Sequence, residues 1–144
     1  MRSPRPTRDA YAHFRPMTTR WRDNDVYAHL NNAVYYEYVD AAVNGWIIDS
    51  GALEIPGGDV VGLVVETGCT FHAAISYPDR IDTGLRVDRI GSSSVHYAIG
   101  MFRNDEMQAS AAARFVHVYV DAATHRPTAI PVPFREALKT LLIG

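Results

Sequence analysis

The sequence predicts an α+β domain in which an antiparallel sheet of about five strands wraps around one long helix. Two observations support this prediction. One long segment near the start has helical periodicity, and a series of strand-like segments fills most of the chain after residue 60. No repeat or second zone of composition divides the chain, so residues 12–144 are predicted to form one domain. Residues 1–11, rich in arginine and proline, are expected to be a flexible tail.

The long helix is predicted from Asn32 to about Asp49. Its apolar residues recur at spacings of three and four, which is typical of a helix with one buried face. These residues are Val34, Tyr38, Ala41 or Ala42, Gly45 and Trp46. Asn31 is a suitable N-cap, and Ser50-Gly51 is a typical helix end.

The strands are predicted from segments rich in β-branched and aromatic residues. Their predicted ranges are 13–22, 62–75 with a break at Gly68, 80–90, 95–101 and 110–121. Pro78-Asp79 and the run 103–106 are turn signals between them. A short second helix is predicted after Pro133, through Leu141.

The composition indicates a globular protein and argues against several functional classes. The chain is 47% hydrophobic and 21% charged with a net charge of −2, so no overall positive charge points to nucleic acid or a membrane surface. No apolar run approaches the roughly 20 residues that span a bilayer, and no secretory signal is evident. The single cysteine, Cys69, argues against an intrachain disulfide and is expected to be a small core residue. We expect a cytoplasmic location.

The segment 20–36 concentrates polar residues just before the long helix. Its polar side chains include Asp23, Asp25, His29, Asn31 and Asn32. A carboxylate beside the first turn of a helix faces N–H groups that carry partial positive charge and can stabilise a developing oxyanion. Such a carboxylate can instead be a loop residue that caps the helix. The segment therefore indicates either a hydrolytic site or a capped loop.

The chain resembles the hotdog-fold acyl-CoA thioesterases of the 4-hydroxybenzoyl-CoA thioesterase type. The resemblance begins in Trp21-Arg22-Asp23-Asn24-Asp25-Val26-Tyr27-Ala28-His29-Leu30-Asn31-Asn32 with Tyr35, continues in 91–95 and 115–121, and ends in Arg126-Pro127 and Ile130-Pro131. It covers roughly residues 12 to 140. It implies a hotdog fold and a thioester hydrolase that releases free CoA and a carboxylic acid. No cofactor is implied, because coenzyme A is part of the substrate.

The resemblance also implies roles for individual residues. Asp25 takes the position of the catalytic carboxylate, either as nucleophile or as general base. The N–H of Asn32 is the candidate donor to the thioester carbonyl. His29 either orients Asp25, binds the thioester oxygen or transfers a proton, or it is only a packed hydrogen-bonding residue. Tyr35 is a candidate pocket wall whose hydroxyl contacts the acyl group.

Two neighbours of these residues allow alternatives. Asp23 is expected to be structural, bonding the loop or pairing with Arg20 or Arg22. Alternatively, it shares a strand face with Asp25, so that one of the two carboxyl pKa values rises and supplies a base. Ala28 stands where the family usually has glycine, and alanine is strained there if the site needs a positive φ.

The predicted contacts to CoA lie further along the chain. Ser92, Ser93 and Ser94, with Arg89 before them, stand where related enzymes place groups near the CoA phosphates. The three serines can equally form only a turn. No metal site is expected, because no histidine on the predicted strands has a carboxylate at ligand spacing.

In this family the sheets of two protomers join edge to edge, with the active site between them. The resemblance therefore implies a homodimer or a homotetramer, and no nucleic-acid or membrane partner is expected. Two other functions remain open: a hotdog hydratase acting on enoyl thioesters, and a non-catalytic acyl-CoA binder. The Asp-x-Asp pattern before the helix argues against the hydratase, and the absence of a basic segment gives no support to a DNA-linked regulator.

Overall fold

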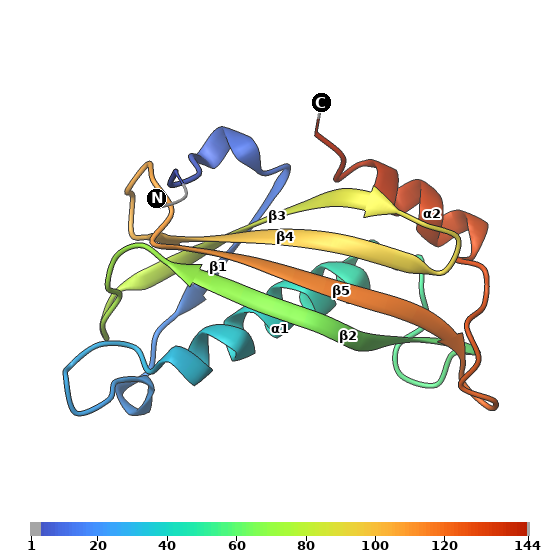
Figure 1. The fold of residues 1–144 in the computed structure, drawn as a ribbon, viewed down its shortest axis with the longest axis horizontal. Helices are drawn as coiled ribbons and strands as arrows, with labels where there is room; N and C mark the ends of the chain where they lie inside the picture. Colours follow the sequence, from blue (N-terminus) through green and yellow to red (C-terminus); the bar gives the residue numbers. More distant parts are fainter. Residues whose placement is uncertain (1–3, 144) are drawn as a thin grey trace.

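The computed structural model describes residues 4–143. One five-stranded antiparallel sheet, in the order β1-β3-β4-β5-β2, lies over the long helix α1 (Figure 1). The elements are β1 (His13–Thr18), α1 (Asn32–Ser50), β2 (Val60–Phe71), β3 (Arg80–Ile90), β4 (Ser94–Arg103), β5 (Ala111–Asp121) and α2 (Val132–Lys139), with short 3-10 turns η1 (Arg8–Ala10) and η2 (Trp21–Asp23). The predicted α+β class is confirmed.

Helix α1 begins and ends where its capping residues predicted. The Asn31 side chain accepts a hydrogen bond from the Ala33 N–H (3.0 Å), and Gly51 ends the helix with φ of +65°. The buried residues are Tyr35, Tyr38, Val39, Ala42, Val43, Trp46 and Ile47. The predicted buried face differs at two residues, because Val34 and Gly45 are only half-buried. The helix is apolar over much of its circumference, so periodicity alone did not decide which face meets the sheet.

The main core lies between the inner face of the sheet and the two helices. Phe134 of α2 contacts Tyr119 of β5 and Trp46 of α1, with ring centroids 5.2 and 6.3 Å apart. These contacts place α2 beside the C-terminal half of α1. The N-terminal end of α1 points the other way along the sheet, toward the loop that precedes it (Figure 1).

The first strand is shorter than predicted. β1 ends at Thr18 rather than at residue 22, and residues 21–23 form the turn η2. The Asp23 carboxylate accepts a hydrogen bond from the Arg20 N–H (2.9 Å), which closes this turn. Asp23 and Asp25 therefore do not share a strand face.

Strand β2 differs from the prediction at its middle and at its end. It runs without a break through Gly68 and stops at Phe71, before the predicted end at residue 75. The Arg114 side chain of the neighbouring β5 lies over Gly68, where a Cβ would be 2.5 Å from its Nη1. The glycine therefore makes room for a cross-strand side chain and does not interrupt the ladder.

The residues before β1 pack against the sheet, which differs from the flexible tail predicted for residues 1–11. Arg5 donates to the Ala109 carbonyl (2.9 Å), and Arg8 pairs with Asp82 (2.8 Å). Tyr11 is buried in a second apolar cluster on the outer face of the sheet. These partners come together only in the folded sheet, so the arginines looked like free charges in the sequence. Residues 1–3 of the predicted tail lie outside the described residues.

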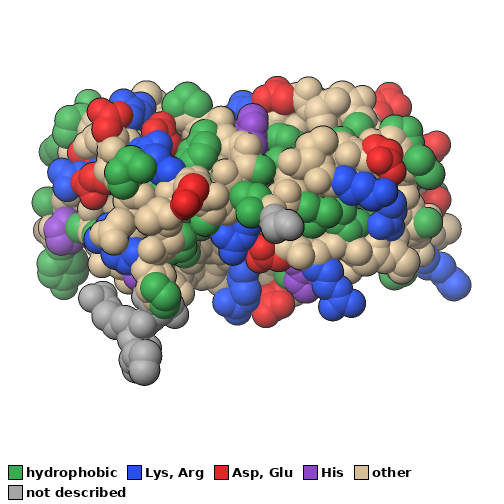
Figure 2. All heavy atoms as spheres, turned by 90° about the horizontal axis from the view of Figure 1, so that it is seen from above, with side chains coloured by type: hydrophobic (Ala, Val, Ile, Leu, Met, Phe, Trp, Pro, Cys, Tyr) green, Lys and Arg blue, Asp and Glu red, His purple; other side chains and the backbone are tan. Residues whose placement is uncertain are grey.

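The charged side chains form no large area of one sign on the face drawn in Figure 2, where basic and acidic residues are interspersed. Several of them pair across the surface, as Arg103 does with Asp79 (2.8 Å). Among residues 4–143, no helix is long and apolar enough to cross a membrane.

His117 of β5 is a titratable group inside the core. Its side chain is only 3% exposed, and its Nδ1 lies 3.0 Å from the hydroxyl of Tyr119, which in turn lies 2.8 Å from the hydroxyl of Tyr97. Burial lowers the pKa of His117 to about 4. The folded protein therefore holds this imidazole neutral at neutral pH.

We expect the free energy of unfolding to fall as the pH drops from 7.5 to 5. An unfolded histidine titrates near pH 6.5, so the unfolded state takes up a proton in this range while folded His117 stays neutral. The loss is about 2 kcal/mol at pH 5, and the stability is fully present above about pH 7. Urea unfolding of wild type and of His117→Asn at both pH values measures it. An equal pH dependence in the variant would contradict the assignment.

Candidate active site

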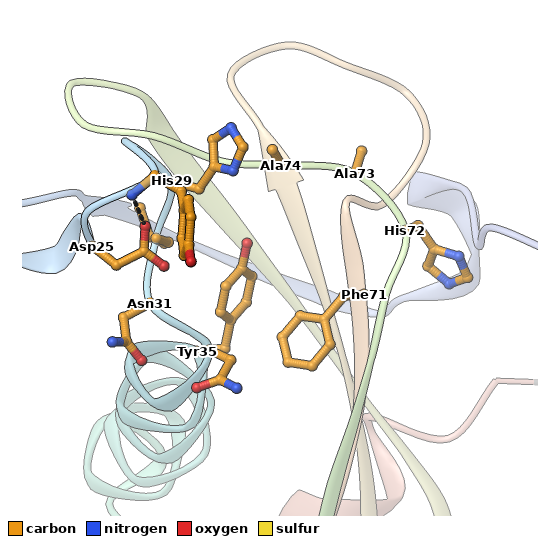
Figure 3. Close-up of a pocket in the computed structure, with 11 residues that line it drawn as sticks. Asp25, His29, Asn31, Tyr35, Phe71, His72, Ala73 and Ala74 are labelled. Atoms are coloured by element: carbon orange, nitrogen blue, oxygen red, sulfur yellow. Dashed lines mark hydrogen bonds between the residues drawn. The ribbon is translucent and has the colours of Figure 1, made fainter.

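A pocket of about 700 Å³ opens beside the N-terminus of α1 (Figure 3). Its lining residues come from the loop before α1, from the first turn of α1 and from the chain that leaves β2. They are Asp25, Tyr27, His29, Leu30, Asn31, Asn32, Tyr35, Phe71, His72, Ala73 and Ala74. The pocket therefore contains four of the predicted site residues: Asp25, His29, Asn32 and Tyr35.

A tight turn presents Asp25 to this pocket. Asn24 and Leu30 form an isolated antiparallel bridge at the base of the turn, and the Asp25 N–H donates to the His29 carbonyl (2.8 Å). The Asp25 carboxylate accepts a hydrogen bond from the Tyr27 N–H (2.8 Å), the dashed contact in Figure 3. The turn therefore fixes the direction of the carboxylate with its own backbone.

The first turn of α1 leaves one backbone donor available at the pocket. Asn31 accepts from the N–H groups of both Ala33 (3.0 Å, side chain) and Val34 (2.9 Å, carbonyl). The N–H of Asn32 makes no hydrogen bond to another residue of the described chain. A helix N-terminus carries partial positive charge, so this N–H is suited to bind a polarised carbonyl oxygen.

Apolar side chains form the other side of the pocket. The rings of Tyr35 and Phe71 meet edge to face with centroids 4.9 Å apart, and Ala73 and Ala74 leave space beside them. Tyr35 is only 4% exposed, and burial raises the pKa of its hydroxyl, which contacts the backbone of Ile75. Tyr35 thus serves as a wall, with its hydroxyl already engaged by the protein.

The two histidines of the pocket lie on opposite sides of it. His29 follows Asp25 in the same turn, and Figure 3 shows it on the Asp25 side of the pocket. His72 lies beyond Phe71, on the side away from Asp25 (Figure 3). Of the two, only His29 is placed to act together with the Asp25 carboxylate.

Asp23 does not line the pocket, although it is only two residues from Asp25. Its side chain is 1% exposed and is bound by Arg20 and by the Tyr38 hydroxyl. Burial by itself would raise the pKa of Asp23, but the hydrogen bonds from Tyr38 and Arg20 outweigh it and hold the pKa below its usual value. These contacts support the structural role rather than the alternative of a second base, and the partner is Arg20.

The predicted CoA-binding residues lie away from the pocket of their own chain. The loop 91–93 joins β3 to β4 at the opposite end of the sheet from Asp25, near α2 (Figure 1). It forms a turn held by other elements: Arg135 donates to the Gly91 carbonyl (2.7 Å), and the Ser93 carbonyl accepts from the Tyr119 N–H (2.7 Å). One chain does not bring Ser92, Ser93, Ser94 or Arg89 together with Asp25, because β3 and β4 span the length of the sheet.

Sequence reasoning missed the pocket wall formed by Phe71, His72, Ala73 and Ala74. The predicted second strand extended through these residues to Ile75, which concealed the point where the chain leaves the sheet. The one available signal was the change from Thr70-Phe71 to the small pair Ala73-Ala74, and alone it is weak.

Two other kinds of reactive group, a cysteine nucleophile and a metal site, find no support in the structure of residues 4–143. Burial raises the pKa of the Cys69 thiol to about 11, so it is not an activated nucleophile. Within residues 4–143, no group of three or more His, Cys, Asp or Glu side chains is arranged to hold a metal ion. The groups of this pocket that remain candidates for chemistry are therefore the Asp25 carboxylate, His29 and the helix terminus.

Ala28 has a φ of +63° in the turn that carries Asp25. Its N–H donates to the Asp25 carbonyl (3.1 Å), and the chain turns back at Ala28 so that the His29 carbonyl accepts the Asp25 N–H (2.8 Å). Alanine is strained there and glycine is not. We expect Ala28→Gly to raise the free energy of unfolding, by up to about 1 kcal/mol after the greater entropy of the unfolded glycine chain is subtracted. Urea denaturation measures this; a clear loss of stability would show that the turn does not need positive φ.

Comparisons with known proteins identify the family and the fold of this chain. The family model described as "Thioesterase-like superfamily" matches residues 19–138. The PA5185 protein of Pseudomonas aeruginosa is 50% identical, with a TM-score of 0.94 over 96% of this chain and 97% of that one. Two enzymes show the same fold at low sequence identity. The 1,4-dihydroxy-2-naphthoyl-CoA thioesterase Slr0204 of Synechocystis is 17% identical, with a TM-score of 0.79 over 88% of this chain and 94% of that one. The DHNA-CoA thioesterase of Staphylococcus aureus is 14% identical, with a TM-score of 0.78 over 88% of this chain and 87% of that one. No curated protein matches the chain. The chain therefore has a hotdog fold and belongs to the thioesterase-like superfamily.

Proposed function

We propose that this protein hydrolyses acyl-CoA thioesters and releases free CoA and a carboxylic acid. The observation that supports this most directly is the Asp25 carboxylate, held by its own turn at a pocket that the N-terminus of α1 also lines. A carboxylate and an available helix N–H at one pocket are the two groups that attack on a thioester carbonyl requires.

The two groups have complementary roles in the proposed reaction. The Asn32 N–H binds the carbonyl oxygen of the thioester and stabilises the negative charge that develops on it. The Asp25 carboxylate either removes a proton from an attacking water or attacks the carbonyl carbon itself, giving an anhydride that water then cleaves. In both routes the C–S bond breaks and the CoA thiolate leaves. Tyr35 and Phe71 supply an apolar surface for the acyl group.

We expect Asp25→Asn to reduce kcat for thiol release by at least about 100-fold, since its amide neither attacks nor accepts a proton. The measurement follows free thiol from acetyl-, medium-chain, long-chain and benzoyl-CoA. Asp40→Asn is the matched control, because Asp40 is an exposed carboxylate of α1 outside the pocket.

Each other outcome of this experiment has a distinct meaning. Binding of the acyl-CoAs without thiol release would indicate an acyl-CoA binder. Addition of water to an enoyl-CoA without thiol release would indicate a hydratase. Wild-type turnover by Asp25→Asn would refute the assignment of the catalytic carboxylate.

The proposed enzyme works as a dimer that joins two copies along β2. This strand is at one edge of the sheet, and its outer side pairs with no other strand of the described chain. Leu63, Val64 and Val65 are 41, 49 and 59% exposed there, on either side of an irregularity in the pairing with β5 between Val64 and Glu66, and a second strand would cover them. A homotetramer would be a pair of such dimers.

An antiparallel dimer also accounts for the predicted CoA contacts. The exposed run 63–67 is centred on Val65, and a two-fold axis at Val65 places Phe71 of one copy opposite Asp59 of the other. The loop 91–93 lies at the same end of the sheet as residue 60, because Ser94 pairs with Val118 and Val118 with Leu63. Ser92, Ser93, Ser94 and Arg89 of one copy would then approach the pocket of the other, which supports their proposed role in binding CoA.

We expect Val65→Lys to weaken the dimer by more than tenfold, because two lysines would face each other near the axis. The Val65 side chain is largely exposed in one chain, so the fold should tolerate the change. Val132→Lys, at an exposed site on α2, is the control. Sedimentation equilibrium measures the effect, and an unchanged mass for Val65→Lys would place the interface elsewhere.

A further inference from the structure

We propose that Asp23 is a positioning residue for the reaction, acting through Asp25 without touching the substrate. This inference rests on the proposed function, because it assumes that Asp25 is the catalytic carboxylate. Asp23 is 1% exposed and does not line the pocket, yet it joins the turn that carries Asp25 to the helix that carries Asn32.

The Asp23 side chain makes three hydrogen bonds and one further charge contact, which together use both of its oxygens. Oδ1 accepts from Nε of Arg20 (3.0 Å) and lies 2.8 Å from the Arg20 Nη2. Oδ2 accepts from the Arg20 N–H (2.9 Å) and from the Tyr38 hydroxyl. Tyr38 belongs to α1, and burial together with the bond to Asp23 raises the pKa of Tyr38 to about 12. The buried carboxylate thus joins η2 directly to the helix.

The backbone of Asp23 reaches the same helix at its start. Its carbonyl accepts the N–H of Asn31 (2.9 Å), and Asn31 is the N-cap of α1. One residue therefore holds the helix at two points, the N-cap and the position of Tyr38. The position of the Asn32 N–H relative to η2 follows from these two contacts.

The turn that carries Asp25 begins directly after this junction. Its base is the bridge between Asn24 and Leu30, and Leu30 is held by the Ile75 carbonyl (2.8 Å). Asp25 is thus separated from Asp23 by a single residue, and its other contacts are within the turn itself. The turn is also held by the chain after β2, because the Asn24 side chain accepts the Tyr77 N–H (3.1 Å) and the Ala28 carbonyl accepts the Ser76 hydroxyl (2.8 Å). Asp23 fixes the other side, since it bonds η2, one residue before Asp25, to the helix that carries the Asn32 N–H.

A displacement of η2 relative to α1 would affect the rate of the reaction more than it affects substrate binding. The acyl group packs on Tyr35 and Phe71, which Asp23 does not contact. Attack on the carbonyl, in contrast, requires the Asp25 carboxylate and the Asn32 N–H at the correct distance from each other. Misplacement of a reacting group by about 1 Å can cost about 100-fold in rate. A loss of Asp23 should therefore appear mainly in kcat.

The test compares Asp23→Asn and Tyr38→Phe with wild type, with Asp25→Asn as the reference for loss of the catalytic carboxylate. We expect Asp23→Asn to lower kcat for thiol release from acyl-CoA by about 10- to 100-fold, with KM changed less than about threefold. Tyr38→Phe removes one of the three hydrogen bonds to the Asp23 carboxylate and should lower kcat in the same direction by a smaller factor. If Asp23→Asn does not fold, Tyr38→Phe carries the test alone.

Asp82→Asn is the matched control for a purely structural effect. Asp82 is also a largely buried carboxylate paired with two arginines, Arg8 (2.8 Å) and Arg80 (3.3 Å), but it lies on the outer face of the sheet. Its loss should lower stability and leave kcat of the folded enzyme unchanged.

Two results would overturn the proposal. If Asp23→Asn and Tyr38→Phe lower only the stability, as Asp82→Asn does, the carboxylate is structural and the proposed function stands. If Asp25→Asn keeps wild-type turnover, the proposed site fails and the role of Asp23 fails with it. The two failures are therefore distinguishable by the Asp25→Asn reference.

Discussion

The packing of α1 against the inner face of the sheet is the interaction on which the rest of the structure depends. An antiparallel sheet with an apolar face must bury that face, and one helix of 19 residues covers most of its length. Phe134 and the rest of α2 cover the sheet near the other half of α1. The first turn of α1 is left facing an open pocket, so the helix terminus is available to a ligand.

Polar groups at the start of α1 are divided between holding the fold and facing the pocket. Asp23 is buried, and all of its hydrogen bonds stay inside the protein, which offsets the cost of removing a carboxylate from water. Asp25 bonds only within its own turn and keeps its carboxylate at the pocket. Two carboxylates with a single residue between them thus have different environments because a 3-10 turn, rather than a strand, connects them to β1.

Local signals predicted the elements well where one residue type decides the geometry. Asn31 and Gly51 marked the ends of α1, because a side-chain acceptor and a left-handed residue are direct requirements of helix ends. Prediction failed where a distant partner decides: Gly68 does not break β2, because it pairs with Arg114 of the neighbouring strand within a continuous ladder. The N-terminal arginines likewise find their partners only across the folded sheet.

By itself the sequence determined the α+β class, the single long helix with its caps, and the segment from which Asp25, His29, Asn32 and Tyr35 come. These follow from patterns within one stretch of chain. Only the tertiary structure decided that Asp23 points inward, that the chain leaving β2 at Phe71 forms the facing wall, and that Ser92, Ser93 and Ser94 lie at the other end of the sheet. Each of these depends on contacts between segments far apart in the sequence, which a local pattern does not contain.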